Sequence, residues 1–536
     1  MYSNSGDIMP RTTSSRAWAC GAVGLLGAAL ALLATSKYGI SHHSDSARYI
    51  SVARSLAQGQ GFTGYDGRPE IWSAPLYPLV LSIAAWLDAD LLTVARYLHA
   101  LMYGLTLLLG ARWLASLRLT TVAWAIATCL MLFATPLFEQ ATTALTDMLF
   151  ALLTTLSLVL LNRFLLRPST PRLLVAASCV AFAWLTRLVG VTFVMVGASL
   201  ILLPRTAGWR ERLRDSLVFG LVASAPNALW LARNYFATGE AVGLGAAPTI
   251  TFLGYSQIIA TIIGTWFLPP RIPEDARTAL GFVVLICTAS VLVLGVRKTL
   301  SNRVAADIDQ CIAIRTAAFF VLTYIGFVNV MISRTYVTDW PDRYFVPVVI
   351  PIIGLLAVVA EKVLRLLARR APVFSRSLAC ASLLLLVWPA RHLAGWIQYS
   401  LEHGAGGYAT DRWQRSRTLE YLRLNTPTSE FYTNEPNAIY FHGGSISARW
   451  LPAHGLPGAP ADATSALESL RDSLRAETRA LVVLFQPNAP ALKAYSYTRK
   501  EIENVFDAIL IASLDDGTIL SLGPRAPRDR LPGGSR

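Results

Sequence analysis

Long apolar stretches separated by short polar loops fill most of the chain, from residue 17 to residue 390. Such stretches predict membrane-spanning helices, because about 20 apolar residues are needed to cross the hydrocarbon core of a bilayer. The pattern predicts about eleven spans, and we expect their ends to shift by a few residues because several stretches are short. We place them at residues 17–36, 94–111, 119–136, 146–161, 173–187, 189–203, 216–232, 278–296, 316–332, 344–360 and 377–390.

Residues 74–88 form a further apolar stretch, which we interpret as an interfacial or re-entrant helix. The stretch is shorter than a full span and contains Pro75 and Pro78. A crossing here would also move the Arg-rich loops that follow it to the outer side of the membrane. An ordinary short span is the alternative. Residues 247–266 are rich in Thr, Ser and Gln, and we expect a second interfacial element there.

The positive charge of the chain follows its predicted topology. The formal net charge is +14, and Arg and Lys gather in short loops between the apolar stretches. This distribution is the positive-inside pattern of membrane proteins and argues against nucleic acid as a partner. It assigns the N-terminus and the following loops to the cytoplasm: 112–118, 162–172, 204–215, 297–315 and 361–376.

An odd number of spans then places the C-terminal part of the chain outside the cytoplasm. We therefore expect an all-α polytopic membrane domain over residues 1–390, with an external loop at 37–93, followed by an extracytoplasmic α/β domain over 391–536. In the second domain the pattern predicts helices at 411–424 and 462–475, strands at 480–485 and 508–513, and a disordered tail at 525–536.

The external loop carries the first candidate for chemistry, Asp45. Apolar positions recur with helical spacing from Asp45 to Ala57, and Ser44 is a candidate N-cap, so Asp45 is predicted to lie in the first turn of a surface helix. A carboxylate there is favoured by the helix dipole and is positioned to act on a lipid-borne substrate from the water side. The alternative is that Asp45 only caps the helix.

A second acid, Asp147, begins an apolar helix after the next external loop. Together with Asp45 it would form a two-carboxylate site able to hold a divalent cation or to share the work of a general base. The alternative is a charge that merely favours the start of the helix.

Arginines stand where the outer loops meet the membrane: Arg187, Arg233, Arg334 and Arg343. A guanidinium at that depth suits a bound phosphate through paired hydrogen bonds. For each arginine taken alone, the alternative is a side chain that extends to the lipid head groups.

Six segments together resemble the GT-C superfamily of membrane glycosyltransferases, in particular the branch of protein O-mannosyltransferases and lipid A aminoarabinose transferases. In order they are SDSARYISVARSLAQGQGF, SAPLYPLVLS, TALTDMLFALL, WLTRLVG, LARNYFATG and DRYFVPVVIP. The resemblance covers residues 17 to about 360, and the C-terminal part only loosely. It implies transfer of a sugar, with inversion, from a polyprenyl phosphate carrier to an acceptor on the non-cytoplasmic face.

By this resemblance Asp45 and Asp147 match the acids of the first and second external loops, with a possible divalent cation between them. Residues Tyr49, Pro75 and Tyr77 match the substrate loop. Relatives often carry a Lys where this chain has Ser73. We therefore expect the carrier phosphate to be bound here by Arg343, Arg233, Arg68 or Arg187 instead. Relatives also often have a second acid at the place of Ser46, so a metal site is weaker here.

The predicted function is therefore a membrane glycosyltransferase that uses a polyprenyl-phosphate-linked sugar and a glycan, lipid or protein acceptor. A secondary transporter or lipid-linked sugar flippase is the alternative, although the acids stand at helix ends and no repeated halves are visible. No N-x-S/T sequon occurs, and none of the six cysteines lies in an expected external segment. We interpret these features as those of a bacterial inner-membrane protein with a periplasmic active site.

Overall fold

The computed structural model describes the chain in segments that carry all of the candidate site residues. The described residues are 14–203, 208–243, 250–300, 308–334, 341–425, 431–444, 446, 448–452, 463–474, 480–486 and 497–523. The expected tail at 525–536 and parts of the loops at 204–215 and 297–315 lie outside them.

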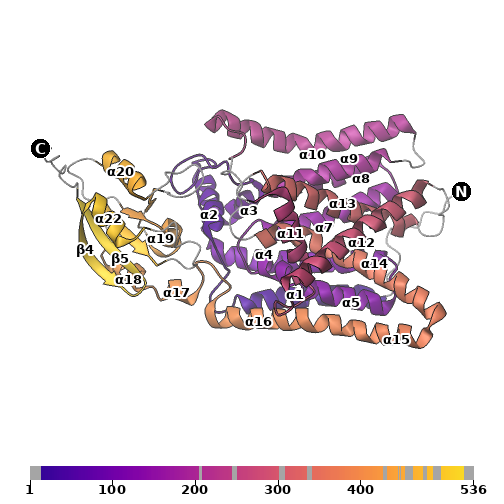
Figure 1. The fold of residues 1–536 in the computed structure, drawn as a ribbon. Helices are drawn as coiled ribbons and strands as arrows, with labels where there is room; N and C mark the ends of the chain where they lie inside the picture. Colours follow the sequence, from indigo (N-terminus) through magenta and orange to yellow (C-terminus); the bar gives the residue numbers. More distant parts are fainter. Residues whose placement is uncertain are drawn as a thin grey trace, which may run out of the picture. The chain divides into compact units, whose positions relative to one another are not determined.

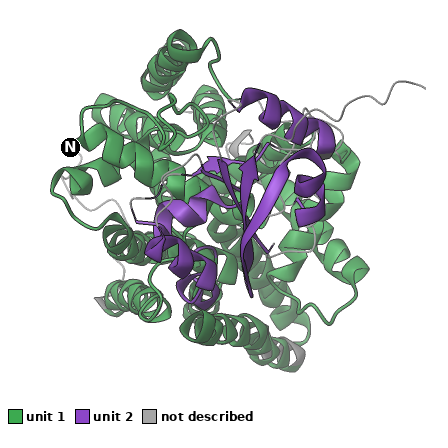
Figure 2. Ribbon diagram, turned by 90° about the vertical axis from the view of Figure 1, so that its left-hand side faces the viewer, with its two compact units in different colours: residues 1–406 green, residues 407–536 purple. Residues whose placement is uncertain are grey.

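The chain divides into two compact units, Met1–Gly406 and Gly407–Arg536 (Figure 2). The division lies beyond the expected boundary at residue 390, because the last helix of the first unit continues to His403. Figure 1 labels most of the helices of both units and the strands β4 and β5. The first unit consists of α1 (Ser14–Ala34), α2 (Ser44–Ala57), α3 (Leu76–Trp86), α4 (Leu91–Ser116), α5 (Thr121–Leu132), α6 (Thr135–Ala141), α7 (Asp147–Leu166), α8 (Thr170–Thr186), η1 (Leu188–Gly190), α9 (Val191–Leu202), α10 (Trp209–Thr238), α11 (Phe252–Thr265), α12 (Glu274–Leu300), α13 (Ile308–Ile332), η2 (Pro341–Phe345), α14 (Val346–Arg370), α15 (Pro372–Ala381), η3 (Ser382–Leu386) and α16 (Val387–His403).

The first unit is a multi-span membrane region. All of the expected apolar stretches are helical, but within the described residues only eight helices are long and apolar enough to cross a membrane by themselves. The pair α5 and α6 makes a ninth if counted as one span, and it bends by 48°. Helices α8 and η1–α9, expected as two further spans, fall short of that length. The predicted count of eleven is therefore not confirmed.

The breaks have local causes in the sequence. Pro136 stands in the first turn of α6 and has no N–H to donate to the carbonyl four residues earlier, at the end of α5, so the helix cannot continue unbroken and the chain bends between α5 and α6. Arg187 has an extended backbone, with φ −150° and ψ 135°, and ends α8. The second break lies at a residue of the candidate site, Arg187.

Two short apolar helices correspond to the expected interfacial elements. Helix α3 has 11 residues and α11 has 14. Helix α3 exposes the large apolar side chains of Leu79, Ile83 and Trp86. A placement of these helices in the membrane interface stays a prediction.

The second unit is built on a mixed five-stranded sheet in the order β2-β1-β3-β5-β4. Strand β1 is parallel to β2 and β3, whereas β5 is antiparallel to β3 and β4. The predicted strands are confirmed as β3 and β4, and the predicted helix at 411–424 is divided into two. The elements are α17 (Asp411–Gln414), α18 (Arg417–Leu424), β1 (Phe431–Thr433), α19 (Pro436–His442), β2 (Arg449–Trp450), α20 (Ala463–Ser473), β3 (Ala480–Phe485), α22 (Arg499–Val505), β4 (Asp507–Leu514) and β5 (Gly517–Gly523).

Both faces of this sheet are covered, which explains the continuous apolar run of β3. Val482 packs in one cluster with Leu467 of α20 and Ile502 of α22. Its neighbour Val483 packs in another cluster with Leu419 of α18. Successive side chains of a strand point to opposite faces, so the two clusters lie on opposite sides of the sheet.

Small residues bring α1 and α4 into close contact in the first unit. A Cβ added at Gly24 would lie 2.7 Å from the carbonyl oxygen of Gly104, and a Cβ added at Gly104 would lie 2.8 Å from that of Gly24. Membrane helices associate through such close backbone approaches, because lipid tails offer no hydrophobic driving force between them.

Replacing Gly24 with alanine should therefore force α1 away from α4. We expect Gly24→Ala to destabilise the protein by about 1–3 kcal/mol, measured as the unfolding midpoint of purified protein in nanodiscs. Gly21→Ala is the matched control on the same helix, because nothing lies within 4 Å of a Cβ added there. Equal midpoints for the two variants would contradict the close contact.

Candidate active site

A short parallel β-bridge joins the two segments that carry the candidate acids. Ser41 pairs with Thr143. The Ser41 amide donates to the Thr142 carbonyl at 2.8 Å, and the Ala144 amide donates to the Ser41 carbonyl at 2.8 Å. Asp45 follows Ser41 by the same number of residues as Asp147 follows Thr143, and each acid lies in the first turn of its helix. The bridge therefore presents the two carboxylates together.

The first turn of α2 holds Asp45 as expected, with one correction. The N-cap is His43 and not Ser44, because the helix already includes Ser44. Ser46 closes the turn by accepting a hydrogen bond from the His43 amide at 2.9 Å. The residue that stands in place of a second acid thus caps the helix that presents Asp45.

Asp45 forms an ion pair with Arg343 of η2. The Arg343 Nη1 donates to Asp45 Oδ2 at 2.9 Å. The Asp45 side chain keeps 26% of its surface exposed and the Arg343 side chain 15%, so the pair lies at the edge of the fold within reach of a ligand. Arg48, one helical turn after Asp45, approaches the same carboxylate at 3.9 Å.

The electrostatic environment controls the protonation of this carboxylate. Burial raises the pKa of Asp45, but the charges of Arg343 and Arg48 outweigh it and hold the pKa below the ordinary value of 3.8. Burial lowers the pKa of the neighbouring His43 to about 4, with Arg343 adding to the effect and Asp45 opposing it. At neutral pH the site therefore contains an ionised Asp45 beside a neutral His43.

Asp147 is buried and forms an ion pair with Arg187, whose Nη1 donates to Asp147 Oδ1. The other carboxylate oxygen, Oδ2, is buried without a hydrogen-bond partner. The guanidinium of Arg187 lies over the ring of Tyr344, 4.9 Å from its centroid. Arg343 also interacts electrostatically with both Asp147 and Asp45. The structure thus brings four predicted site residues into one cluster.

The predicted substrate-loop residues lie behind this cluster. Tyr49 packs edge-to-face on Tyr77, with ring centroids 5.5 Å apart. The hydroxyl of Tyr77 shares a hydrogen bond with His99 Nε2 at 2.9 Å, and His99 Nδ1 in turn lies 3.0 Å from the Gln140 carbonyl. Pro75, buried at the N-cap of α3, fixes the entry of the chain into that helix. These contacts hold α2 and α3 against α4.

Arg233 has a different set of contacts. Its Nη1 donates to the Glu70 carbonyl at 3.0 Å and its Nη2 to the Phe62 carbonyl at 3.0 Å. The guanidinium also lies 5.4 Å from the ring of Phe62 and 5.1 Å from that of Trp230. In this state Arg233 fastens residues 62–70 to α10.

Arg68 and Ser73 are two further positions that the sequence connected with the phosphate site. Arg68 is exposed, and its amide donates to Asp66 Oδ1 at 3.1 Å. Ser73 is buried, and its amide donates to Glu70 Oε1 at 3.0 Å. The cations that act on Asp45 are Arg343 and Arg48, with a smaller contribution from Arg187.

The described residues do not fit a resident divalent cation. Asp45 and Asp147 are each paired with an arginine, which already neutralises the carboxylate. Within the described segments no group of three His, Cys, Asp or Glu side chains is arranged to hold a metal ion. We therefore derive no catalytic step from a metal.

Sequence reasoning did not select Arg48, Tyr344 and Thr146 as site residues. Arg48 follows Asp45 by three residues, and this helical spacing was a usable signal. Tyr344 directly follows Arg343, and its carbonyl accepts a hydrogen bond from Tyr324 of α13 at 2.6 Å. Thr146 bonds the hydroxyl of Tyr49 through its side chain, a contact between distant segments that no local pattern reveals.

Comparison with known proteins confirms the fold. Neither a protein-family model nor a curated protein matches the sequence. The structure is similar to that of ArnT from Cupriavidus metallidurans in the apo state, with a TM-score of 0.55 and 16% identity over 95% of this chain and 98% of that chain. The values are the same for ArnT bound to undecaprenyl phosphate.

A second similar structure is arabinofuranosyltransferase AftD from Mycobacteria, with a TM-score of 0.51 and 14% identity. The match covers 96% of this chain and 42% of AftD, so the chain spans less than half of that protein. The chain thus shares the fold of ArnT over nearly its full length, as the resemblance seen in the sequence predicts.

The buried pair of Arg187 and Asp147 gives a test of how the cluster is stabilised. Arg187→Met should destabilise the protein by about 3–5 kcal/mol, because it leaves the Asp147 carboxylate buried and unpaired. Arg187→Met combined with Asp147→Asn should recover most of this loss. Unfolding of the two single variants and the double variant completes the cycle, and additive effects would show that the residues do not interact.

Proposed function

We propose that the protein transfers a sugar from a polyprenyl-phosphate carrier to a hydroxyl group of an acceptor, with inversion at the anomeric carbon. The observation that carries the proposal is the partly exposed pair of Asp45 and Arg343, a carboxylate and a guanidinium joined at 2.9 Å. Sugar transfer from a lipid phosphate needs one base for the acceptor and one cation for the departing phosphate.

In this reaction the acceptor oxygen attacks the anomeric carbon while the bond from that carbon to the phosphate oxygen breaks. The acceptor proton passes to Asp45, and the bonding electrons leave with the polyprenyl phosphate. Arg343 stabilises the charge that develops on the phosphate through paired hydrogen bonds. No nucleotide is required, because the carrier phosphate is itself the leaving group.

The ion pair seen in the structure also regulates the base. A carboxylate paired with two arginines is a weak base, since its pKa is lowered. A donor phosphate that binds Arg343 competes with Asp45 for the same guanidinium. Donor binding therefore weakens the hold on Asp45, raises its pKa and makes it a better base when the substrate is present.

Asp147 acts in this proposal as a positioning residue. It holds Arg187, and Arg187 packs on Tyr344, the residue next to Arg343. The tether from Tyr324 to the Tyr344 carbonyl fixes the same turn. Arg343 is thus placed from two sides before the donor arrives, which lowers the cost of ordering it.

The fold supports the choice of donor. ArnT from Cupriavidus metallidurans, which has the same fold, has been solved bound to undecaprenyl phosphate. We propose that this chain also uses a polyprenyl-phosphate carrier. Besides Arg343, the residues Arg233, Arg68 and Arg187 are candidates to bind its phosphate. We also propose an extracytoplasmic active site in a bacterial inner membrane, with residues 391–536 on the same side.

Removal of the base should abolish transfer without loss of the fold. We expect Asp45→Asn to lower kcat by about 100-fold or more, because an amide cannot accept the proton. The same variant should bind the donor at least as tightly as the wild type, since Arg343 loses its competing partner. The measurements are turnover of a lipid-linked sugar and binding of undecaprenyl phosphate. Near-normal turnover of Asp45→Asn would show that Asp45 is not the base and only caps its helix.

The phosphate contact is tested by a change that keeps the charge. Arg343→Lys should weaken donor binding by about tenfold, because the paired hydrogen bonds of the guanidinium are lost. Arg334→Lys is the control at an exposed arginine. Equal donor affinity in both variants would move the phosphate site to Arg233, Arg68 or Arg187.

The exchange of partners at Arg343 predicts a specific pH dependence. In the free enzyme the pKa of Asp45 is below 3.8, so its ionised form persists as the pH falls. In the donor complex the pKa is raised, so protonation disables the base at a higher pH. The acidic limb of kcat should therefore lie at higher pH than that of kcat/KM. Coincident limbs would show that the donor leaves the pair of Asp45 and Arg343 intact.

A further inference from the structure

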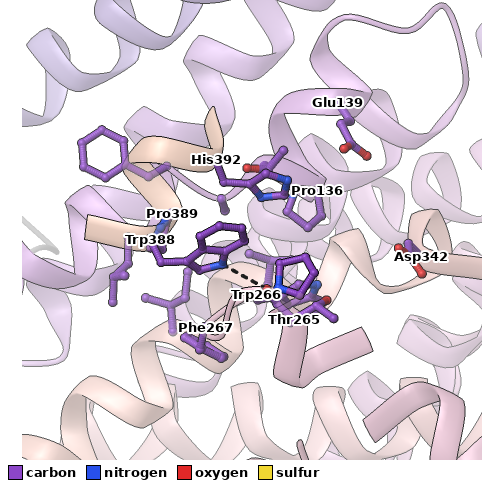
Figure 3. A pocket seen from close by; sticks show the side chains of 16 residues that line it. Pro136, Glu139, Thr265, Trp266, Phe267, Asp342, Trp388, Pro389 and His392 are labelled. Atoms are coloured by element: carbon purple, nitrogen blue, oxygen red, sulfur yellow. Dashed lines mark hydrogen bonds between the residues drawn. The ribbon is translucent and has the colours of Figure 1, made fainter. Parts of the chain in front are cut away.

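Figure 3 shows a cavity beside the turn η2, whose lining includes Asp342, Glu139, Trp388 and His392. Its volume is about 100 Å³. Pockets that bind small molecules usually measure about 300–1,000 Å³. Because this cavity is smaller than that and Asp342 directly precedes Arg343, we treat it as part of the site already described.

A second cavity, of about 320 Å³, lies where α2 ends and the chain turns from α3 into α4 (Figure 1). Its volume is within the range of a ligand pocket. The small side chains of Ala57, Ala85 and Ala89 line it and leave this space open. It belongs to the stretch between α1 and α4 that also carries Asp45, and neither α2 nor α3 is among the helices long enough to cross a membrane. The cavity and Asp45 therefore lie on the same side of the membrane.

Four longer side chains give this cavity a flat apolar face and both kinds of hydrogen-bonding group. Trp86 keeps 74% of its surface exposed and lines the cavity with its indole. Arg54 supplies donors, Asp88 supplies acceptors, and the amide of Gln58 supplies both. A ligand that matches this lining therefore combines donors and acceptors with an apolar face of its own.

The charges around the cavity favour a neutral ligand. Arg54 interacts electrostatically with Asp90, which stands between two lining residues and caps α4 by accepting a hydrogen bond from the Thr93 amide at 2.9 Å. A phosphate here would meet the carboxylates of Asp88 and Asp90 as well as the guanidinium. An ammonium ion would meet the guanidinium. Neither ion finds surroundings of one opposite charge.

The backbone at Asp88 is adapted to present this carboxylate. Asp88 has φ 53°, in the left-handed region that favours glycine, directly after the last turn of α3. Asp and Asn enter this region more easily than other residues with a side chain. The turn thus supplies a polar group to the cavity, and Asn is a replacement that keeps the turn and removes the charge.

We propose that this cavity binds a neutral sugar ring. A sugar ring has a face of C–H groups that can stack on the indole of Trp86, and each of its hydroxyl groups both donates and accepts. Arg54 and Gln58 then donate to the hydroxyl groups, and Asp88 accepts from them. A zwitterionic lipid head group would match the charges of Arg54 and Asp88, but it has no flat apolar face for the indole.

The distance to Asp45 indicates which sugar is bound. Asp45 and Arg54 both lie on α2, and at about 1.5 Å per residue they are about 14 Å apart along the helix. A single sugar ring does not span this distance, so a substrate that reaches both places is an oligosaccharide. The assignment of the bound ring to the acceptor rests on the proposed function. The cavity then holds a unit of the acceptor glycan remote from the hydroxyl group that attacks.

The test is a binding measurement on the full chain that needs no transfer activity. Purified protein in phosphatidylcholine nanodiscs, which avoid detergents with sugar head groups, is titrated with neutral trisaccharides of glucose, galactose, mannose and N-acetylglucosamine. Glycerophosphoethanolamine, a water-soluble zwitterionic head group, is the comparison. We expect at least one trisaccharide to bind at about 10 mM or below, and more tightly than the head group. Binding by none of the trisaccharides, or tighter binding of the head group, would overturn the proposal.

Variants locate the binding in this cavity. Trp86→Ala should weaken trisaccharide binding by about tenfold, because the stacking surface is lost. Trp18→Ala, the same change at an indole of α1 that is 80% exposed, should leave it unchanged. Folded Trp86→Ala protein with wild-type affinity would overturn the proposal. If Trp86→Ala does not fold, Asp88→Asn decides: we expect a loss of about threefold or more, and unchanged affinity would be contrary evidence.

Two further measurements separate this site from the proposed reaction. Asp45→Asn should retain trisaccharide binding, so a failure of the transfer reaction leaves the sugar site standing. In a transfer assay, Trp86→Ala should raise the KM for the acceptor by about tenfold and leave kcat unchanged, since a remote unit is bound equally in the ground state and the transition state. A lower kcat with unchanged KM would contradict the assignment to the acceptor.

Discussion

The backbone bridge between Ser41 and Thr143 is the constraint on which the site depends. It is made of two hydrogen bonds of 2.8 Å and joins segments separated by about 100 residues. Because Asp45 and Asp147 follow it at equal offsets, one short contact sets the mutual position of two helix starts and both acids. In a bundle of membrane helices, backbone that is not helical must form its hydrogen bonds with other protein groups, because the lipid offers none. The bridge supplies such hydrogen bonds next to the two acids of the proposed site.

The two ion pairs of the cluster have different surroundings, and this difference separates their roles. Asp147 and Arg187 are buried, and breaking that pair leaves an unpaired charge, so it is suited to hold structure. Asp45 and Arg343 retain access to solvent, so a ligand can replace one partner at a lower cost. An arginine that is held between a base and a phosphate couples donor binding to activation of the base. The structure thus needs no metal ion to explain how the site responds to its substrate.

The sequence was sufficient for the features that local patterns determine. Apolar length predicted the helical stretches, and the first-turn position of Asp45 followed from helical spacing. The predicted count of spans is not confirmed where polar breaks shorten helices, as at Arg187, because apolar length does not show where a helix ends. The partners of the acids could not be predicted either, since Arg343 reaches Asp45 across about 300 residues. The hydrogen bonds from Arg233 to the carbonyl groups of Phe62 and Glu70 could not be predicted either, because these residues are far apart in the sequence.

The central claim is that Arg343 exchanges Asp45 for the phosphate of the donor. A structure of the full chain in nanodiscs with undecaprenyl phosphate tests it most directly. The account predicts that the phosphate contacts the Arg343 guanidinium and that the contact from Nη1 to Asp45 Oδ2, now 2.9 Å, is broken. A phosphate bound elsewhere, with the pair of Asp45 and Arg343 intact, would contradict it.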